Sequence, residues 1–237
     1  MKRTKSELKE TRNFRNMARA YVPYYVEFAK KHDLTCTQTL LYGIIWQYSK
    51  LEHKAYTGSI QTLQVALNVA RATVKKDLKT LVDGGFITKS TDKNGRNLYN
   101  CAVEPQKNDI FIPITLRYAV AHNLTPHQIV IYTIIVKASK QTHKAYTGSV
   151  TTLANILNCS RGTVINVLET LIRRGFIIKY KDLSANVTFV DGLSHKSGKT
   201  EKELEFNALW VKENGLVRGK IGRSARKKGG GLTKIGW

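Results

Sequence analysis

Residues 57–87 read TGSIQTLQVALNVARATVKKDLKTLVDGGFI, and this stretch decides the fold that we expect for the chain. Its apolar residues Val74, Leu78 and Leu81 are spaced i, i+4 and i+7, which predicts a helix that buries one face. A shorter helix, of about nine residues, precedes it and begins after the cap Ser59. Two helices joined by a tight turn are typical of a helix-turn-helix.

The same pattern recurs 90 residues later, where residues 147–177 read TGSVTTLANILNCSRGTVINVLETLIRRGFI. Residues 21–89 can be laid over residues 111–179 without a gap, with 32 identities in 69 positions. Seven residues, HKAYTGS, recur intact at 53–59 and 143–149. A gapless match of this length is not chance, so we expect two tandem domains with one fold that arose by internal duplication.

The residues around each helix-turn-helix complete the expected domain. The capping box of Thr35 and Gln38 precedes an apolar run that predicts a buried helix, with Tyr42 and Trp46 in the core. Thr125, Gln128 and Tyr132 repeat this pattern, and Pro126 suits the first helical turn. The short segment at Tyr56, Thr57 and Gly58 is expected to be extended.

Two strands are expected after the second helix of each copy, which ends near Gly85 or Gly175. In the first copy the chain returns through Asn94 and Gly95, a pair that favours a type I′ hairpin turn. A helix-turn-helix followed by such a hairpin is a winged helix.

The predicted fold class is therefore mainly α with small β-hairpins (α+β). The expected segments are a basic helix at 1–20, winged-helix domains at 21–104 and 110–190, a linker at 105–109, and a C-terminal helix with a basic, glycine-rich tail at 191–237. The neighbourhoods of Pro23 and Pro113 suggest further extended or helical segments, which stay unassigned.

The charge balance indicates a polyanionic partner. The chain has 39 Lys and Arg against 17 Asp and Glu, a net charge of +22, and the excess is spread over every segment. Nucleic acid is the first candidate and an anionic membrane surface the second. We expect no membrane partner, because no apolar run approaches about 18 residues. Cys36, Cys101 and Cys159 form no pair typical of zinc or a disulfide, so a reducing bacterial cytoplasm is the expected compartment.

The repeated stretch resembles a bacterial helix-turn-helix family that carries S-x-x-x-L, a turn, and then S/A-R-x-T-V-x-x-x-L-x-x-L-x-x-x-G-x-I. The family is found in plasmid replication initiators, phage replisome organisers and related regulators. The resemblance covers about 55 residues in each copy, and it implies a winged-helix fold and binding of double-stranded DNA. Ala70 departs from the usual hydroxyl cap of the second helix, while Ser160 keeps it.

The second helix of each pair is expected to enter the major groove. Arg71 and Arg161 suit guanine, Asn166 suits adenine and Ile165 suits a thymine methyl group, while lysines hold phosphates. The full set of predicted DNA-binding residues is Ser59, Arg71, Thr73, Lys75, Lys76, Lys79, Lys93, Arg96, Ser149, Ser160, Arg161, Thr163, Ile165, Asn166 and Lys181. The alternative for these basic faces is a solvated helix surface. The two copies differ at these positions. We therefore expect either that the two DNA half-sites have different sequences, or that one domain mainly anchors the protein on DNA.

The leading hypothesis for the role is a replication initiator or replisome organiser of a plasmid, phage or mobile element. A transcriptional repressor and a nonspecific DNA-coating protein are the alternatives. The termini are expected to recruit host replication proteins. For the tail by itself, nonspecific phosphate binding is the first expectation and a peptide that binds a protein partner is the alternative. Monomer and homodimer both stay open. No phosphate-binding loop, HExxH motif or paired acidic cluster occurs, so we expect no enzymatic activity, cofactor or metal, with a hidden Tyr/His site as the exception to test.

Overall fold

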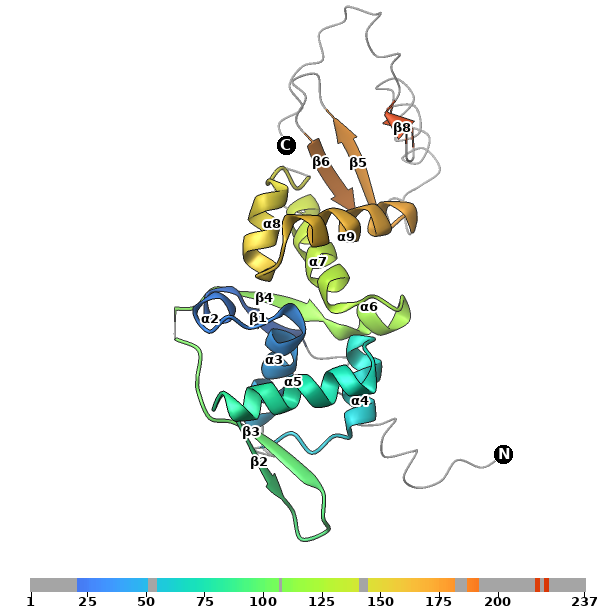
Figure 1. Cartoon of the computed structure of the whole chain (residues 1–237). Coiled ribbons are helices and arrows are strands. Elements are labelled where there is room, and N and C mark those ends of the chain that lie inside the picture. Colours follow the sequence, from blue (N-terminus) through green and yellow to red (C-terminus); the bar gives the residue numbers. More distant parts are fainter. Residues whose placement is uncertain are drawn as a thin grey trace, which may run out of the picture. The chain divides into compact units, whose positions relative to one another are not determined.

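The computed structural model describes residues 21–50, 55–106, 108–140, 145–181, 187–191, 216–217 and 220–221. Over these residues it is a mixed α/β structure with eight helices and two-stranded antiparallel sheets (Figure 1). The chain divides into two compact units. The first unit is Met1–Val130 with Ala154–Ser160, and the second unit is Ile131–Leu153 with Arg161–Trp237. The predicted N-terminal helix at 1–20 lies outside the described residues.

The first unit opens with a strand that pairs far along the chain. β1 (Tyr21–Tyr25) lies antiparallel to β4 (Phe111–Thr115), with Pro23 opposite Pro113. Each strand has a single partner in this two-stranded sheet, so a residue without an amide hydrogen is tolerated in both. The short helices α2 (Val26–Lys31) and α6 (Leu116–Ala121) follow the two strands, and α6 packs against the helix-turn-helix through α4.

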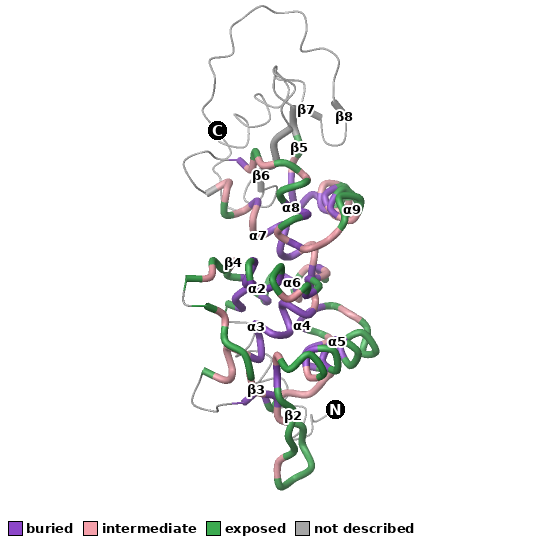
Figure 2. The backbone as a smooth tube through the Cα atoms, turned by 60° about the vertical axis from the view of Figure 1, so that its left-hand side comes forward, coloured by how far each residue is buried: buried purple, intermediate pink, exposed green. Residues whose placement is uncertain are grey.

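The core of the first unit is built on α3 (Cys36–Lys50), whose middle is buried on nearly all sides (Figure 2). The predicted capping box is present, because Gln38 Oε1 accepts from the amide of Thr35 at 3.0 Å and Thr35 Oγ1 accepts from the amide of Gln38 at 3.3 Å. Tyr42 is fully buried, as expected. Trp46 is only half-buried, which corrects its placement as a core residue, because it lies where the helix approaches the surface.

The helix-turn-helix of the first unit consists of α4 (Ile60–Leu67) and α5 (Arg71–Asp83). Asn68 ends α4 in the left-handed conformation, at φ 49°. A Schellman motif ends α5: the amide of Phe86 donates to Leu81 O and that of Gly85 donates to Val82 O, both at 2.9 Å. Gly85 has φ 71°, which explains why the helix ends here.

The wing of the first unit is the hairpin of β2 (Ile87–Thr91) and β3 (Asn97–Cys101). Tyr56 adds a single antiparallel bridge to Tyr99, so the short extended segment expected before α4 is present. The predicted type I′ turn is wrong. That turn needs positive φ at two residues, whereas Gly95 alone has it here, at 74°. Asp92 closes a longer loop by bonding to Arg96, so the left-handed glycine follows an ordinary turn.

The remaining elements are α7 (Pro126–Lys140), α8 (Val150–Leu157), α9 (Arg161–Arg173), β5 (Ile177–Lys181) and β6 (Val187–Asp191). Each has the bounds of its counterpart in α3, α4, α5, β2 and β3 displaced by 90 residues. The division between the two units falls within α7 and α8. Within the second unit, Tyr132 is buried as predicted and its ring meets Phe176 edge-on, with centroids 5.7 Å apart.

The C-terminal segment is described at four residues. Leu216–Val217 and Lys220–Ile221 form the paired strands β7 and β8, within the segment that contains the predicted basic, glycine-rich tail. The predicted C-terminal helix lies outside the described residues. Among the residues that the structure describes, no helix combines the length and the apolar character needed to cross a membrane.

Candidate nucleic-acid interface

The helix α5 has one apolar face and one charged face. Val74, Leu78 and Leu81 are at most 3% exposed, and the helix packs through them toward α3 and α4. All of the residues predicted on the opposite face are exposed: Arg71, Thr73, Lys75, Lys76 and Lys79. This division of the helix into two faces is visible along α5 in Figure 2. The buried side fixes the helix, and the cationic side is left available for a partner.

One acidic residue of α5 is turned away from this charged face. Asp77 is only 7% exposed, and its Oδ1 accepts a hydrogen bond from Gln38 Nε2 at 3.1 Å. Burial raises the pKa of Asp77, while the bond from Gln38 and the charge of Lys76 act in the opposite direction. Between Arg71 and Val82 the outward face of α5 therefore carries no exposed carboxylate.

The start of α4 has its side-chain cap in place. Ser59 Oγ accepts from the amide of Thr62 at 3.1 Å and contacts the Thr62 hydroxyl at 3.0 Å. Ser149 makes the same two contacts with Thr152 before α8, both at 3.0 Å. The two serine side chains are thus used to cap helices. Any phosphate at these helix starts would bind backbone amides that the caps leave unbonded.

The tip of the first wing is held by Asp92. Its Oδ1 accepts from the amides of Asn94 and Arg96, both at 2.8 Å. These backbone hydrogen bonds, chiefly the one from Arg96, lower the pKa of Asp92. The loop therefore presents Lys93 and Arg96 from a bonded turn, and both side chains are exposed. The sequence offered a signal for this turn, since an Asp two residues before Asn favours a side-chain-closed loop.

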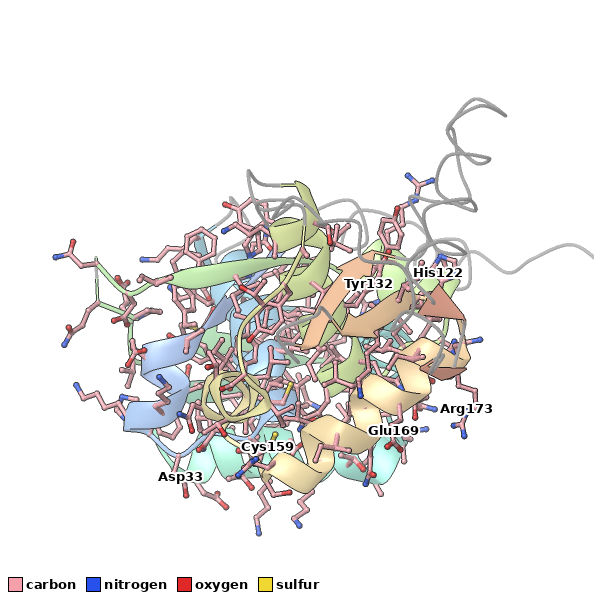
Figure 3. The ribbon with its side chains drawn as sticks, turned by 90° about the horizontal axis from the view of Figure 1, so that it is seen from above. Asp33, His122, Tyr132, Cys159, Glu169 and Arg173 are labelled. Carbon is pink, nitrogen blue, oxygen red and sulfur yellow. The ribbon has the colours of Figure 1, made fainter. Side chains whose placement is uncertain are left out.

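In the second unit, α9 repeats the buried face of α5 with a different outer face. Val164, Leu168 and Leu171 are at most 4% exposed. Of the predicted DNA-binding residues, Arg161, Ile165 and Asn166 are exposed and Thr163 is half-buried, and Ser160, which precedes α9, is exposed. Glu169 and Arg173 also project from this helix (Figure 3).

The second hairpin contributes fewer described cations. Lys179 on β5 is exposed, whereas Lys181 ends β5 with a side chain outside the described residues. The guanidinium of Arg174 lies over the ring of Phe176, 4.8 Å from its centroid. Cation–π contacts of this kind hold a charged side chain against its own domain. We did not expect this contact from the sequence, because it joins residues on the two sides of the glycine that ends α9.

Comparison with known proteins bears on the second of the two helix-turn-helix segments. Residues 122–177 match the family model described as a helix-turn-helix domain, a span that contains α8 and α9 and less than a quarter of the 237 residues. No curated protein and no solved structure matches the chain. The chain therefore contains a helix-turn-helix domain, and this domain points to DNA binding.

Proposed function

We propose that this chain is a sequence-specific, non-enzymatic protein that binds double-stranded DNA through two tandem winged-helix domains related by internal duplication. The observation that carries the proposal is the outer face of α5, where four cations, Arg71, Lys75, Lys76 and Lys79, are exposed while the acid Asp77 is buried. A face of one charge sign on the second helix of a helix-turn-helix suits the DNA backbone and grooves.

The proposed contacts follow from the size of the duplex and the chemistry of each group. A major groove about 12 Å wide admits one helix, and the N-terminal halves of α5 and α9 would each enter one. Arg71 and Arg161 would bond guanine, because a guanidinium offers two parallel donors to O6 and N7. Lys93 and Arg96 on the first wing, with Lys181 on the second hairpin, would reach the backbone or the minor groove.

For the biological role, we propose a replication initiator or replisome organiser of a plasmid, phage or other mobile element, acting in the bacterial cytoplasm. The resemblance of the repeated motif to such proteins supports this role. The termini, 1–20 and 191–237, would recruit host replication proteins. A repressor would use the same DNA contacts, so the role needs its own test.

DNA binding is tested with the full chain and a fluorescent 40-base-pair duplex over a range of salt concentrations. Lys75→Ala with Lys76→Ala should weaken binding and reduce the slope of log affinity against log salt by about 2, because each lost phosphate contact accounts for about one unit. Lys30→Ala with Lys31→Ala removes two exposed cations from α2, outside the proposed surface, and should leave the slope unchanged. A wild-type chain that ignores duplex at low salt would contradict the proposal.

The role is tested separately. Footprinting should protect a repeat array next to the gene, and a minimal replicon that carries only this gene and that array should replicate. Protection confined to the gene's own promoter would instead indicate the repressor. Equal affinity for every duplex would indicate the coating protein.

A further inference from the structure

The two second helices carry different chemistry on equivalent, exposed positions. Lys75, Lys76 and Lys79 of α5 correspond to Ile165, Asn166 and Glu169 of α9, and all six side chains are exposed. Beneath them the helices keep the same residues: Val74, Leu78 and Leu81 correspond to Val164, Leu168 and Leu171, and all six are buried. The buried faces of α5 and α9 therefore pack with identical residues. Their exposed faces differ in charge and polarity, so they suit two kinds of contact.

The exposed side of α5 and the wing that follows it suit binding to DNA phosphates. Its helix and wing expose seven cations: Arg71, Lys75, Lys76, Lys79, Lys89, Lys93 and Arg96. Five of these are lysines, and a lysine ammonium is a point charge with little geometric preference for one base. Because Asp77 is turned inward, no exposed carboxylate interrupts the helix face between Arg71 and Val82, and the exposed Asp83 lies at its last residue. Contacts of this kind position a protein on DNA without reading its sequence.

The outer face of α9 suits base edges. Ile165 leaves 42% of its surface exposed. Contact between this apolar side chain and another apolar group would remove both from water and would stabilise a complex. The methyl group of thymine is the apolar group that the major groove offers. The side-chain amide of Asn166, the next residue, can make two hydrogen bonds to one adenine, in which it accepts from N6 and donates to N7. Glu169 would be repelled by phosphates, so this part of α9 is unsuited to anchoring on the backbone.

We propose that the two domains divide the task of binding. α9 reads sequence by recognising A·T pairs through Ile165 and Asn166. The lysines of α5 and its wing anchor the protein on phosphates, which leaves Arg71 as the base contact of α5. This inference rests on the proposed DNA-binding function and deepens it. It makes Ile165 and Asn166 the residues that determine specificity for A·T pairs, beside the guanine contacts proposed for Arg71 and Arg161.

The test begins with selection of duplexes by the full chain from a library with a random 40-base-pair core. In the selected duplex, each thymine is then replaced by uracil, which removes one methyl group, and each adenine by 7-deazaadenine, which removes N7. At one thymine, uracil should weaken wild-type binding about fourfold, the value for one buried methyl-sized group. At one adenine, 7-deazaadenine should weaken it by about fivefold or more.

The variants assign these effects to residues. In Ile165→Ala the uracil effect should vanish, and in Asn166→Ala the 7-deazaadenine effect should vanish, with the salt slope unchanged in both. The matched variant Lys75→Ala with Lys76→Ala should bind all duplexes more weakly and should select the same motif. All of these are exposed positions, and matching circular dichroism spectra will confirm that each variant is folded.

Two results would overturn the division of roles. One is a changed motif in the lysine variant. The other is persistence of both base-analogue effects in the Ile165 and Asn166 variants. Failure of the wild-type chain to bind any duplex at low salt is a different outcome, because it would contradict the proposed function itself.

Discussion

Asn158 donates a hydrogen bond from its side-chain Nδ2 to Oδ1 of Asp33 across 2.8 Å, within the first unit (the loop of Asp33 and the neighbouring Cys159 are labelled in Figure 3). Both residues have left-handed backbones, with φ of 48° and 51°. The pair of equivalent positions also meets, since Asn68 Nδ2 donates to Asn123 O at 2.9 Å. The residue that ends the first helix of each helix-turn-helix thus bonds the loop that follows a short helix of the other repeat.

This relationship predicts a stability difference between two substitutions of Asn158. Asn158→Gly keeps access to the left-handed backbone and loses the bonds to Asp33 and Leu34, so it should cost about 1 kcal/mol. Asn158→Ala loses the same bonds and also pays for a left-handed alanine, so it should cost about 1 kcal/mol more. Urea unfolding followed by circular dichroism measures both. Equal costs would show that the backbone conformation of Asn158 contributes nothing.

A second prediction concerns the missing cap of α5. Ala70 occupies the N-cap position and no side chain caps the helix there, whereas Ser160 holds the equivalent position before α9. Ala70→Ser should raise the free energy of unfolding by about 1 kcal/mol, because its hydroxyl can accept from an amide of the first turn. Ser160→Ala should lower it by a similar amount. A loss of stability in Ala70→Ser would mean that this helix start is bonded by another group.

The sequence predicted much of this structure because its local signals agree with its packing. The helices α3 to α5 and the hairpin after them follow from capping residues, helical spacing and a glycine at the helix end. Because the second copy matches the first at an offset of 90 residues, the same signals predicted the corresponding helices and hairpin there. These features depend on residues close together in the chain, where one side chain decides one hydrogen bond.

The features that the sequence missed depend on long-range geometry. The pairing of β1 with β4 joins residues about 90 positions apart, and neither proline-containing strand has a local signal for its partner. The inward turn of Asp77 depends on Gln38 from another helix. Among candidate DNA contacts, the sequence named Arg71 and the lysines of α5 correctly as exposed residues, but their contact with DNA remains a prediction.

A third prediction compares two glycines. A Cβ at Gly43 would lie 2.2 Å from Pro23 O, so Gly43→Ala should cost about 3 kcal/mol because backbone atoms of α3 and β1 must move apart. A Cβ at Gly85 would meet nothing within 4 Å, so Gly85→Ala should cost only the left-handed backbone, about 1 kcal/mol. Thermal unfolding of both variants ranks them. A smaller loss for Gly43→Ala than for Gly85→Ala would contradict the close approach of α3 to β1.

A fourth prediction uses the buried Asp77. Burial raises its pKa above the ordinary value of 3.8, so the folded state favours the protonated carboxyl more than the unfolded chain does. The contribution of Asp77 to stability is therefore fully present below that ordinary value and is lost as the pH rises through the raised pKa. Asp77→Asn keeps an acceptor for Gln38 and cannot ionise. Its stability relative to the wild type should accordingly increase with pH across this window.

Urea unfolding of the wild type and Asp77→Asn at a series of pH values from 3 to 7 measures this difference, and taking the difference between the two proteins removes the titration of all other groups that they share. Asp77→Val, which installs the residue of the second repeat at Val167, is the control. It also cannot ionise, but it leaves Gln38 Nε2 without this acceptor, so it should follow Asp77→Asn at every pH with a constant deficit of about 1 kcal/mol. A gap between the wild type and Asp77→Asn that stays flat with pH would show that the carboxyl of Asp77 titrates alike in the folded and unfolded chain, which would contradict the raised pKa.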